Sequence, residues 1–471
     1  MRSLLATCLI VFCASPLVGA DDRPNVLFIA ADDLRCDLPC YGNQVVKAPH
    51  IEALARRGIV FQRAYCQQAL CNPSRTSLLT GLRPDTLEIW DLPTHFRTPH
   101  PDVVTLPEAF KQQGYFTQDV GKIYHNWIHE VHGDPQSWSV PAQLHFANHG
   151  HDKPVVDGPL PENLAQDRKC ERRDVPDEAY YDGRVAKLAE EAIAEIAKRD
   201  QPFFLAVGFW KPHSPFNAPG KYWDMYERRQ IPVVENDVWP AQTPRIAWHN
   251  SREILGTPAR ELTAAAAQEI RHGYYANISY LDAQVGRVLS ALRSHGLADN
   301  TIIVFWSDHG YHLGEHTLWA KTSNFELDAR VPMIIVPPGD GFAQGHTESI
   351  AELVDLYPTL TELCGVESPG NLEGTSLVPV LKDLDAKVKS AALTVHPRPA
   401  YYKDKMDALG RSLRTEQFRY TEWREPESGT LVGAELYDHK IDPAESKNRL
   451  DDPAYRRVLP GLRQQLRAFS R

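Results

Sequence analysis

Four stretches of the chain are continuously apolar and show no alternation with polar residues. A strand that is buried on both faces of a sheet has this pattern, because neither of its faces meets water. Between them, apolar residues recur at helical spacing. The apolar stretches are residues 25–30, 203–208, 301–306 and 331–336, and a brief further strand is predicted at 59–61. The helical segments are 50–58, 105–113, 182–198, 263–293 and 355–363. Segment 263–293 fits one long helix or two. Strands that alternate with helices predict an α/β fold with a mixed, mostly parallel sheet flanked by helices.

The pattern changes after residue 381. Short strand candidates separated by turns follow at 391–395, 411–415, 418–423 and 435–437, and a polar helical segment starts at 453. This pattern predicts a smaller C-terminal α+β subdomain with a small antiparallel sheet and a helix. We place the boundary near residue 386, so that 21–386 form the catalytic domain and 387–471 the C-terminal subdomain.

The N-terminus has the features of a secretory signal peptide. Arg2 carries one positive charge, residues 4–11 are apolar, and Val18-Gly19-Ala20 offers small side chains for cleavage after Ala20. An uncleaved membrane anchor is the alternative, but the apolar run is short for a bilayer span of about 20 residues. No other stretch predicts a membrane span. We therefore expect a secreted or periplasmic protein that loses residues 1–20.

Composition sets further limits on the function. The net charge of the 471 residues is −10, and removal of Arg2 with the signal peptide makes it 50 − 61 = −11, which argues against nucleic-acid binding. An anionic substrate stays possible, because a local group of basic side chains can reverse the field inside a cleft. Six of the eight cysteines remain after cleavage, and their spacing fits no zinc site. We expect most of them to be free thiols.

Acidic residues follow two of the predicted buried strands. Asp32 and Asp33 come directly after residues 25–30, and Asp308-His309 comes after residues 301–306. Ligands of open α/β sheets gather at the carboxyl ends of the strands, so we expect these side chains to converge. Three converging carboxylates repel one another, and a hard divalent cation, Ca²⁺ in preference to Mg²⁺, is the simplest compensation. Ordinary acidic turn residues are the alternative interpretation.

A candidate nucleophile stands at the start of a predicted helix. In Cys71-Asn72-Pro73-Ser74-Arg75, the proline can occupy a first helical turn and an apolar segment follows. The unpaired N–H groups of a helix start favour an anion, and Arg75 lies one turn later on the same face. For an isolated cysteine, a buried structural thiol is the competing interpretation.

Further candidate donors lie in three other segments. Lys122 and His125 are three residues apart, His213 follows the second predicted strand in Lys211-Pro212-His213, and Lys321 lies downstream of His309. Taken alone, Lys122 and His125 are more often a solvated lysine and an ordinary loop histidine. Taken together, they can donate to a sulfate or phosphate ester and to its leaving oxygen.

The motif around Cys71 resembles the signature of the type I sulfatases. It reads Cys-x-Pro-Ser-Arg and continues as Leu-Thr-Gly-x-Arg at 79–83. Within that family, further segments along almost the whole mature chain are similar to the iduronate-2-sulfatases, namely 32–35, 121–125, 211–213, 279–287, 307–310, 313–321 and 412–415. The chain departs from them at Tyr311-His312, where those enzymes have a tryptophan and a small residue, so the wall facing the sugar differs.

The resemblance implies an alkaline-phosphatase-like fold and a bound Ca²⁺. It implies that the metal ligands are Asp32, Asp33, Asp308, His309 and the modified Cys71. It also implies that sulfate binding and leaving-group assistance fall to Arg75, Lys122, His125, His213 and Lys321.

The resemblance further implies a mechanism and two partners. A formylglycine-generating enzyme oxidises Cys71 to formylglycine, and the aldehyde hydrate attacks sulfur while a histidine protonates the departing alcohol. The second hydroxyl then expels sulfate and regenerates the aldehyde. The expected substrate is a sulfated oligo- or polysaccharide, with the 2-O-sulfate of a uronic acid as the target. A phosphomonoester or phosphonate-ester hydrolase and a non-catalytic glycan-binding protein are the alternatives.

Overall fold

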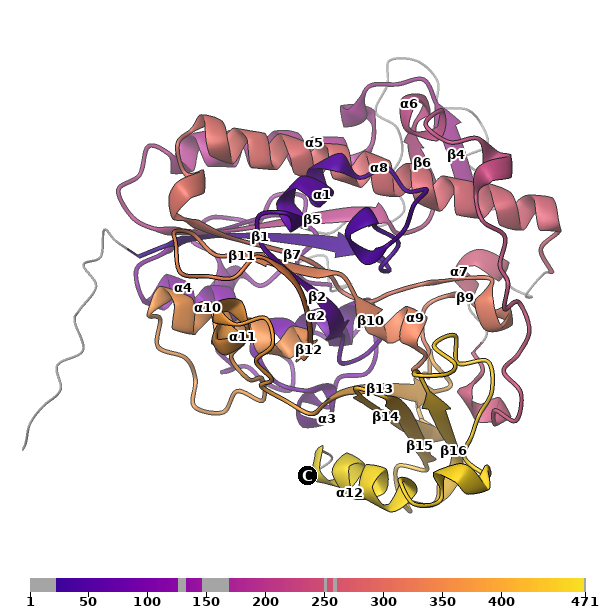
Figure 1. Ribbon diagram of the computed structural model, residues 1–471. Coiled ribbons are helices and arrows are strands. Elements are labelled where there is room, and N and C mark those ends of the chain that lie inside the picture. The colour runs from indigo at the N-terminus through magenta and orange to yellow at the C-terminus, as the bar shows by residue number, and fades with distance from the viewer. Residues whose placement is uncertain (1–22, 126–132, 146–168, 250–251, 257–260, 470–471) are drawn as a thin grey trace, which may run out of the picture.

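An eight-stranded sheet forms the centre of the computed structural model (Figure 1), which describes residues 23–125, 133–145, 169–249, 252–256 and 261–469. Its strand order is β10-β2-β11-β7-β1-β5-β3, and β12 pairs with β2. The strands β3, β5, β1 and β7 are parallel to one another, whereas β11 runs antiparallel to β7 and β2. The bounds are β1 Asn25–Asp32, β2 Ile59–Tyr65, β3 Phe116–Gly121, β5 Phe203–Pro212, β7 Thr301–Ser307, β10 Arg330–Val331, β11 Met333–Val336 and β12 Gly345–Glu352.

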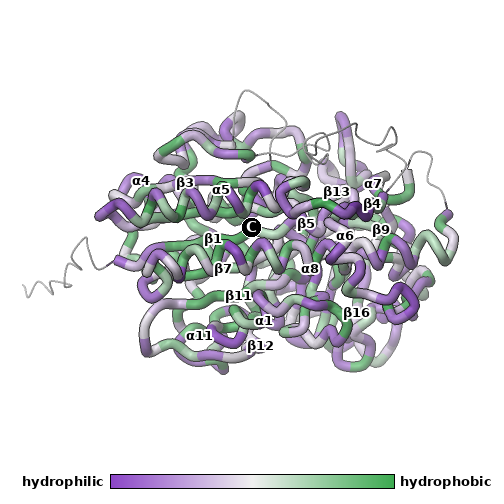
Figure 2. Tube along the Cα trace, turned by 90° about the horizontal axis from the view of Figure 1, so that it is seen from above, coloured by the Kyte–Doolittle hydropathy of each residue, from purple (hydrophilic) through white to green (hydrophobic). Residues whose placement is uncertain are grey.

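Helices cover both faces of this sheet and enclose two apolar cores. Alternate residues of β1 point into opposite cores: Leu27 and Ile29 into one, Val26 and Phe28 into the other. The first core is closed by α1 (Pro49–Ala55), α5 (Tyr181–Ile196) and α8 (Ala264–Ser294). The second is closed by α2 (Cys71–Thr80), α4 (Leu106–Gln112), α10 (Leu356–Cys364) and α11 (Val378–Lys382). Figure 2, in which the molecule is seen from above, shows the apolar strands β1, β7 and β11 largely in green, as expected of strands buried on both faces.

A second, four-stranded antiparallel sheet lies beside the first and carries the C-terminal helix (Figure 1). The apolar face of α12 (Leu459–Phe469) packs on it through Leu459, Leu462 and Leu466. All four strands predicted after residue 381 are present and longer than predicted, while the helix begins six residues after the predicted 453. The strands are β13 Ala391–Arg398, β14 Ala408–Thr415, β15 Phe418–Arg424 and β16 Leu431–Asp438.

The shorter elements lie mainly around the carboxyl ends of the central strands. Two small sheets pair β4 with β6 and β8 with β9. The strands are β4 Cys170–Arg173, β6 Phe216–Pro219, β8 His312–Leu313 and β9 Trp319–Ala320, and the short helices are α3 Pro84–Leu87, α6 Gly220–Trp223, α7 Arg252–Leu255 and α9 Glu326–Ala329.

The structure departs from the predicted elements in several places. Segment 263–293 is one helix, α8, and the strand predicted at 331–336 is divided into β10 and β11 at Pro332, which has no N–H for a strand ladder. Two central strands, β3 and β12, were not predicted. The signal-peptide residues 1–20 lie outside the described residues. Within the described part of the chain, no helix has the length and apolar character needed to cross a membrane, and the six cysteines are free.

Candidate active site

Three carboxylates meet where two neighbouring parallel strands end. Asp32 is the last residue of β1, and Asp308 follows β7, which pairs with β1 up to Ala31 and Ser307. Asp33 adopts a φ of +61°, a conformation uncommon outside glycine, and its N–H donates to Asp308 Oδ1 at 3.1 Å. All three side chains are fully buried. The convergence expected from the sequence is therefore present.

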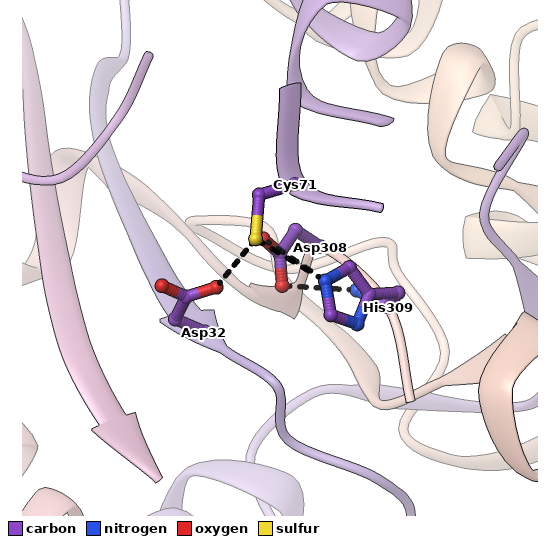
Figure 3. A group of neighbouring side chains, drawn as sticks. All are labelled: Asp32, Cys71, Asp308 and His309. Atoms are coloured by element: carbon purple, nitrogen blue, oxygen red, sulfur yellow. Dashed lines mark hydrogen bonds and ion pairs between the residues drawn. The ribbon is translucent and has the colours of Figure 1, made fainter. Parts of the chain in front are cut away.

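Cys71 is the first residue of α2 and faces this acidic group (Figure 3). Its Sγ is 3.4 Å from Asp32 Oδ1 and 3.4 Å from His309 Nε2. The start of the helix is fixed by Ser74, whose Oγ donates to the Asp308 carbonyl at 2.5 Å, and by the Ser74 N–H, which donates to the Leu70 carbonyl. The motif thus places position 71 between the ends of β1 and β7.

The thiol of Cys71 is unsuited to act as a nucleophile in its unmodified form. Burial, with the neighbouring Asp32 carboxylate, raises the pKa of Cys71 to about 12. The thiolate is the reactive species of a cysteine. With this pKa, almost no thiolate is present at neutral pH. Burial and the nearby carboxylates thus disfavour the thiolate despite the favourable field of the helix start.

The residues around Cys71 suit a hard divalent cation. Asp32, Cys71, Asp308 and His309 each offer a ligand atom, and these atoms all lie within 4.8 Å of one another. His309 Nε2 is also 3.2 Å from Asp33 Oδ1. Burial, with the nearby Glu253 carboxylate adding to it, raises the pKa of Asp33 well above its usual range despite Lys321. A cation would relieve this crowding of charge, since the carboxylates supply oxygen ligands.

Arg75 is fully buried and is held by the protein itself. Its Nε donates to Asp308 Oδ2 at 2.9 Å, and its Nη1 donates to the carbonyls of Lys122 and Ile123 at 2.6 and 3.1 Å. Its Nη2 is 3.6 Å from Asp32 Oδ1. The guanidinium therefore ties the start of α2 to a metal-ligand candidate and to the turn that carries Lys122.

Lys122 reaches the site because two glycines let the backbone approach β5. Lys122 follows Gly121, and its N–H donates to the Gly208 carbonyl at 2.8 Å. A Cβ at Gly121, whose φ is +90°, would lie 2.0 Å from the Gly208 carbonyl oxygen, and one at Gly208 would lie 2.0 Å from the Lys122 carbonyl oxygen. The Lys122 ammonium pairs with Asp32 and lies 4.3 Å from the centre of the Trp210 ring.

Lys321 brings a second buried ammonium group from the segment after β9. Its Nζ lies 2.8 and 2.9 Å from the two oxygens of Asp33. Burial alone would lower the pKa of Lys321, but the Asp33 carboxylate keeps it well above its usual range. Lys321 is therefore charged at neutral pH and can donate hydrogen bonds to an anion.

The two predicted histidines lie at the same site and are neutral before substrate binds. His213 Nε2 is 3.8 Å from Asp33 Oδ2, and both His125 and His213 are almost fully buried. Burial, with Lys122 adding to it, lowers the pKa of His125 well below its usual range, and burial with Lys321 does the same for His213. All ten residues predicted from the sequence thus come together, with the imidazoles uncharged and the lysines as counter-charges.

The sequence analysis missed Glu253, which enters the site from α7. Its Oε2 is 3.2 Å from Lys321 Nζ, and its Oε1 accepts from Ser214 Oγ at 2.9 Å and from Tyr311 Oη at 3.0 Å. Burial alone would raise the pKa of Glu253, but Lys321 holds it well below its usual range. Neither apolar periodicity nor a motif marks this residue, which lies in a proline-rich segment.

Tyr311 and Tyr401 add aromatic groups at the site. Tyr311, where the sequence departs from the iduronate-2-sulfatases, is buried and stacks on Tyr274 with ring centroids 5.6 Å apart. Tyr401 follows β13 in the C-terminal sheet and is 41% exposed. Burial of its hydroxyl raises the pKa of Tyr401. Of the nearby charged groups, Lys321 lowers this pKa and Glu253 raises it. The C-terminal sheet therefore contributes the Tyr401 side chain to the rim of the site.

Comparison with known proteins supplies the family context. The model of the family described as Sulfatase matches residues 24–366, and that described as N-sulphoglucosamine sulphohydrolase, C-terminal, matches residues 314–471. Iduronate 2-sulfatase of Mus musculus is 34% identical, over 97% of this chain and 96% of its own length.

Solved structures share the fold at lower identity. Phosphonate monoester hydrolase of Agrobacterium radiobacter superposes with a TM-score of 0.75 at 24% identity, covering 95% of each chain. A structure described as a 2-O GAG sulfatase superposes with a TM-score of 0.71 at 23% identity, covering 95% of this chain and 92% of that one. The alkaline-phosphatase-like architecture expected from the sequence is confirmed by these likenesses, which show the fold alone.

Proposed function

The chain belongs to the sulfatase family, and we propose from this premise that it removes the 2-O-sulfate of a uronic acid residue in a sulfated glycan. Hydrolysis of sulfate esters follows from the family. The finer assignment takes support from the iduronate 2-sulfatase relative, which is similar over nearly the whole of both chains. The observation that carries the proposal is the position of Cys71, within 3.4 Å of both Asp32 and His309 at the start of α2.

We propose that position 71 acts as formylglycine after conversion by a formylglycine-generating enzyme. The hydrated aldehyde supplies a nucleophilic hydroxyl and a second hydroxyl that allows sulfate to be released. A buried thiol whose pKa is raised to about 12 offers neither. Asp32, Asp33, Asp308, His309 and position 71 would hold a Ca²⁺, which polarises the sulfate oxygens and compensates the acidic cluster.

The remaining charged residues bind the anion and supply protons. Lys122 and Lys321 are buried ammonium groups that can pair with the sulfate oxygens once a cation occupies the carboxylates. Lys321 is protonated before substrate arrives. His125 and His213 are neutral in the free protein, and an arriving anion favours their protonated forms, which makes them proton carriers for the departing alcohol.

Arg75 acts as a positioning residue in this proposal. Its donors are directed to Asp308 and to the carbonyls of Lys122 and Ile123, so it aligns the nucleophile with a metal ligand and an anion-binding lysine. This differs from direct sulfate binding, the role that the sequence resemblance implies for it.

Localisation and domain organisation complete the proposal. We propose cleavage after Ala20 and export, because the first twenty residues have the composition of a signal peptide. We further propose that residues 21–386 form the catalytic domain and that residues 387–471 form the subdomain that contributes Tyr401 to the rim. The expected partners are a sulfated oligo- or polysaccharide and, during maturation, the formylglycine-generating enzyme.

The test is a substrate comparison on protein purified from a host with the maturing enzyme. Sulfate release from 2-O-sulfated uronate oligosaccharides is measured beside release from matched phosphate monoesters and phosphonate esters. We expect the sulfated oligosaccharide to be turned over fastest. A preference for phosphate or phosphonate esters would establish the alternative hydrolase, and tight glycan binding without turnover would establish a non-catalytic protein.

A further inference from the structure

A cavity of about 600 Å³ lies next to the active site and is not used by the chemistry described above. Its size is typical of sites for small organic ligands. Two elements are shared between this cavity and the active site. Helix α7 places Glu253 against Lys321 and Leu255 in the cavity wall, and β9 contributes Trp319 to the wall two residues before Lys321.

The cavity wall combines apolar groups with one buried arginine. Val233, Val234, Leu262 and the Trp319 indole form apolar surface, and Val233 is 72% exposed. Gly314 keeps space between two of them, since a Cβ there would lie 3.1 Å from Trp319 Cζ2 and 3.2 Å from Val234 Cγ2. An aromatic and aliphatic wall of this kind suits the C–H face of a sugar ring.

Arg271 of α8 is the charged group of the cavity. The residue is 5% exposed, and in the described part of the chain its Nε and Nη1 atoms are buried without a hydrogen-bond partner. Arg271 forms one long ion pair among the described residues, in which Glu315 Oε1 is 4.0 Å from Arg271 Nη1. Glu315 is already engaged, since Oε1 accepts from Arg35 Nη1 at 2.9 Å and Oε2 accepts from the Leu313 N–H at 2.7 Å. The guanidinium therefore has no close counter-charge, and as part of the cavity wall it favours an anion in the cavity.

The acidic residues of the cavity do not cancel this charge. Asp237 and Glu261 line it but are exposed, so water and salt screen them, whereas Arg271 is buried. A planar guanidinium is matched by a carboxylate or a sulfate group. An anionic ligand that also presents an apolar ring face satisfies both parts of the wall.

We infer that this cavity is a second subsite, which binds the acidic sugar unit next to the one whose sulfate is removed, with Arg271 pairing with its carboxylate or sulfate group. The inference rests on the proposed function, because the ligand of this cavity is the next sugar of the same glycan, which runs from Lys321 past α7 and β9. It makes the enzyme selective for acidic oligosaccharides over monosaccharides.

The test compares two substrates in the mature protein. One is a 2-O-sulfated uronate monosaccharide glycoside, and the other is a disaccharide in which a second acidic sugar is attached. We expect Arg271→Gln to lower kcat/KM for the disaccharide about tenfold through KM, the effect of one lost charge-assisted contact, and to leave the monosaccharide within about twofold. Arg271→Lys, which keeps the charge, should restore part of the loss.

Two further variants separate recognition from folding. Gln268→Glu places a negative charge in the cavity wall one helical turn before Arg271, where it competes with an anionic ligand for the guanidinium, and should impair the disaccharide selectively. Arg228→Gln removes a surface arginine that pairs with Glu269 at 3.4 Å, outside the cavity, and should change neither substrate. Equal losses on both substrates, or no loss with Arg271→Gln and Gln268→Glu, would overturn the inference.

A binding measurement keeps this result distinct from failure of the proposed function. Calorimetry on Cys71→Ala with an unsulfated acidic disaccharide should show binding that Arg271→Gln weakens about tenfold. If the wild-type protein hydrolyses neither substrate while this binding difference is present, the proposed function fails and the subsite stands. If a neutral disaccharide binds as tightly as the acidic one, Arg271 has no role in recognition and the subsite inference fails.

Discussion

The Lys321 ammonium lies between two buried carboxylates, 3.2 Å from Glu253 Oε2 and 2.8 Å from Asp33 Oδ1. Asp33 is also a candidate metal ligand, so a bound cation would draw its charge away from Lys321. Glu253 is not part of the metal-ligand cluster and would remain as the partner of the ammonium. Hydrogen bonds from Ser214 and Tyr311 hold this carboxylate in place.

Glu253→Gln should therefore impair catalysis while leaving the metal site intact. We expect kcat to fall about tenfold to a hundredfold, the range of a misplaced or weakened donor, with a smaller change in KM. Steady-state kinetics with the uronate 2-sulfate substrate measure this effect. Tyr311→Phe, which removes one hydrogen bond to Glu253, serves as the graded control and should cause a smaller loss. An unchanged kcat in Glu253→Gln would show that Asp33 alone positions Lys321.

Cys71→Ala should abolish turnover and preserve the fold. The substitution removes the group that becomes the nucleophile, and a small buried side chain leaves only a small cavity. Sulfate release and the thermal melt are measured in parallel, and mass spectrometry of the Cys71 peptide from the active protein should detect formylglycine. Cys364→Ala is the matched control, because Cys364 is also a buried free cysteine but lies in α10. Activity in Cys71→Ala, or a pure thiol population in active protein, would refute the assignment.

The sequence predicted those parts of the site that follow strongly patterned elements. Asp32, Asp33 and Asp308 follow strands whose residues are almost all apolar, and Cys71 stands at a helix start with a proline in its first turn. In such places the local pattern and the tertiary environment agree, so the strand ends could be located. The convergence of β1 and β7 then followed from the general arrangement of parallel sheets.

The parts that were missed carry no such local pattern. Strand β3 contains buried Thr117, Gln118 and Asp119, and β12 contains polar residues along most of its length, so neither resembles an apolar run. Glu253 reaches Lys321 only through the packing of α7 on β9, which sequence periodicity does not encode. Long-range pairing, rather than local propensity, decides these elements.

Calcium should stabilise the wild-type protein, and Asp308→Asn should lose much of that stabilisation. A ligand at 100 times its Kd stabilises the folded state by about 2.7 kcal/mol, which appears as a higher Tm. Asp308→Asn also removes the negative charge that lies 2.9 Å from Arg75 Nε, so its metal-free Tm should be lower. Thermal melts with Ca²⁺ and with a chelator measure both effects.

Asp119→Asn is the control for this metal experiment. Asp119 is buried on β3, burial raises its pKa well above the usual range, and it is not part of the ligand cluster. Its variant should keep the full response to Ca²⁺. An equal calcium response in wild type and Asp308→Asn would contradict the metal site.

Glu435→Gln should remove part of the pH dependence of stability. Burial in the C-terminal sheet raises the pKa of Glu435 from 4.5 to about 7, although Trp423 and Tyr437 donate to it at 2.6 and 2.8 Å. Between these two pKa values the folded state binds more protons than the unfolded state, so stability falls as pH rises through the window. The interval from pH 5 to the folded-state pKa of about 7 spans two units, which correspond to about 2.7 kcal/mol, the most that the wild type should lose through this group between pH 5 and pH 8.

Denaturant unfolding at pH 5 and pH 8 measures this difference, with Glu427→Gln as control because the Glu427 side chain is 75% exposed. The glutamine can accept from the Trp423 N–H and donate to the Tyr437 hydroxyl, which is also within 2.8 Å of Thr243 Oγ1, so its own hydrogen bonds are satisfied. We therefore expect Glu435→Gln to be more stable than the wild type at pH 8 and close to it at pH 5. Because other titrating groups are common to both proteins, the difference between their pH profiles isolates Glu435. Parallel profiles would mean that Glu435 is ionised in the folded protein at pH 5, with its charge compensated by the donors around it.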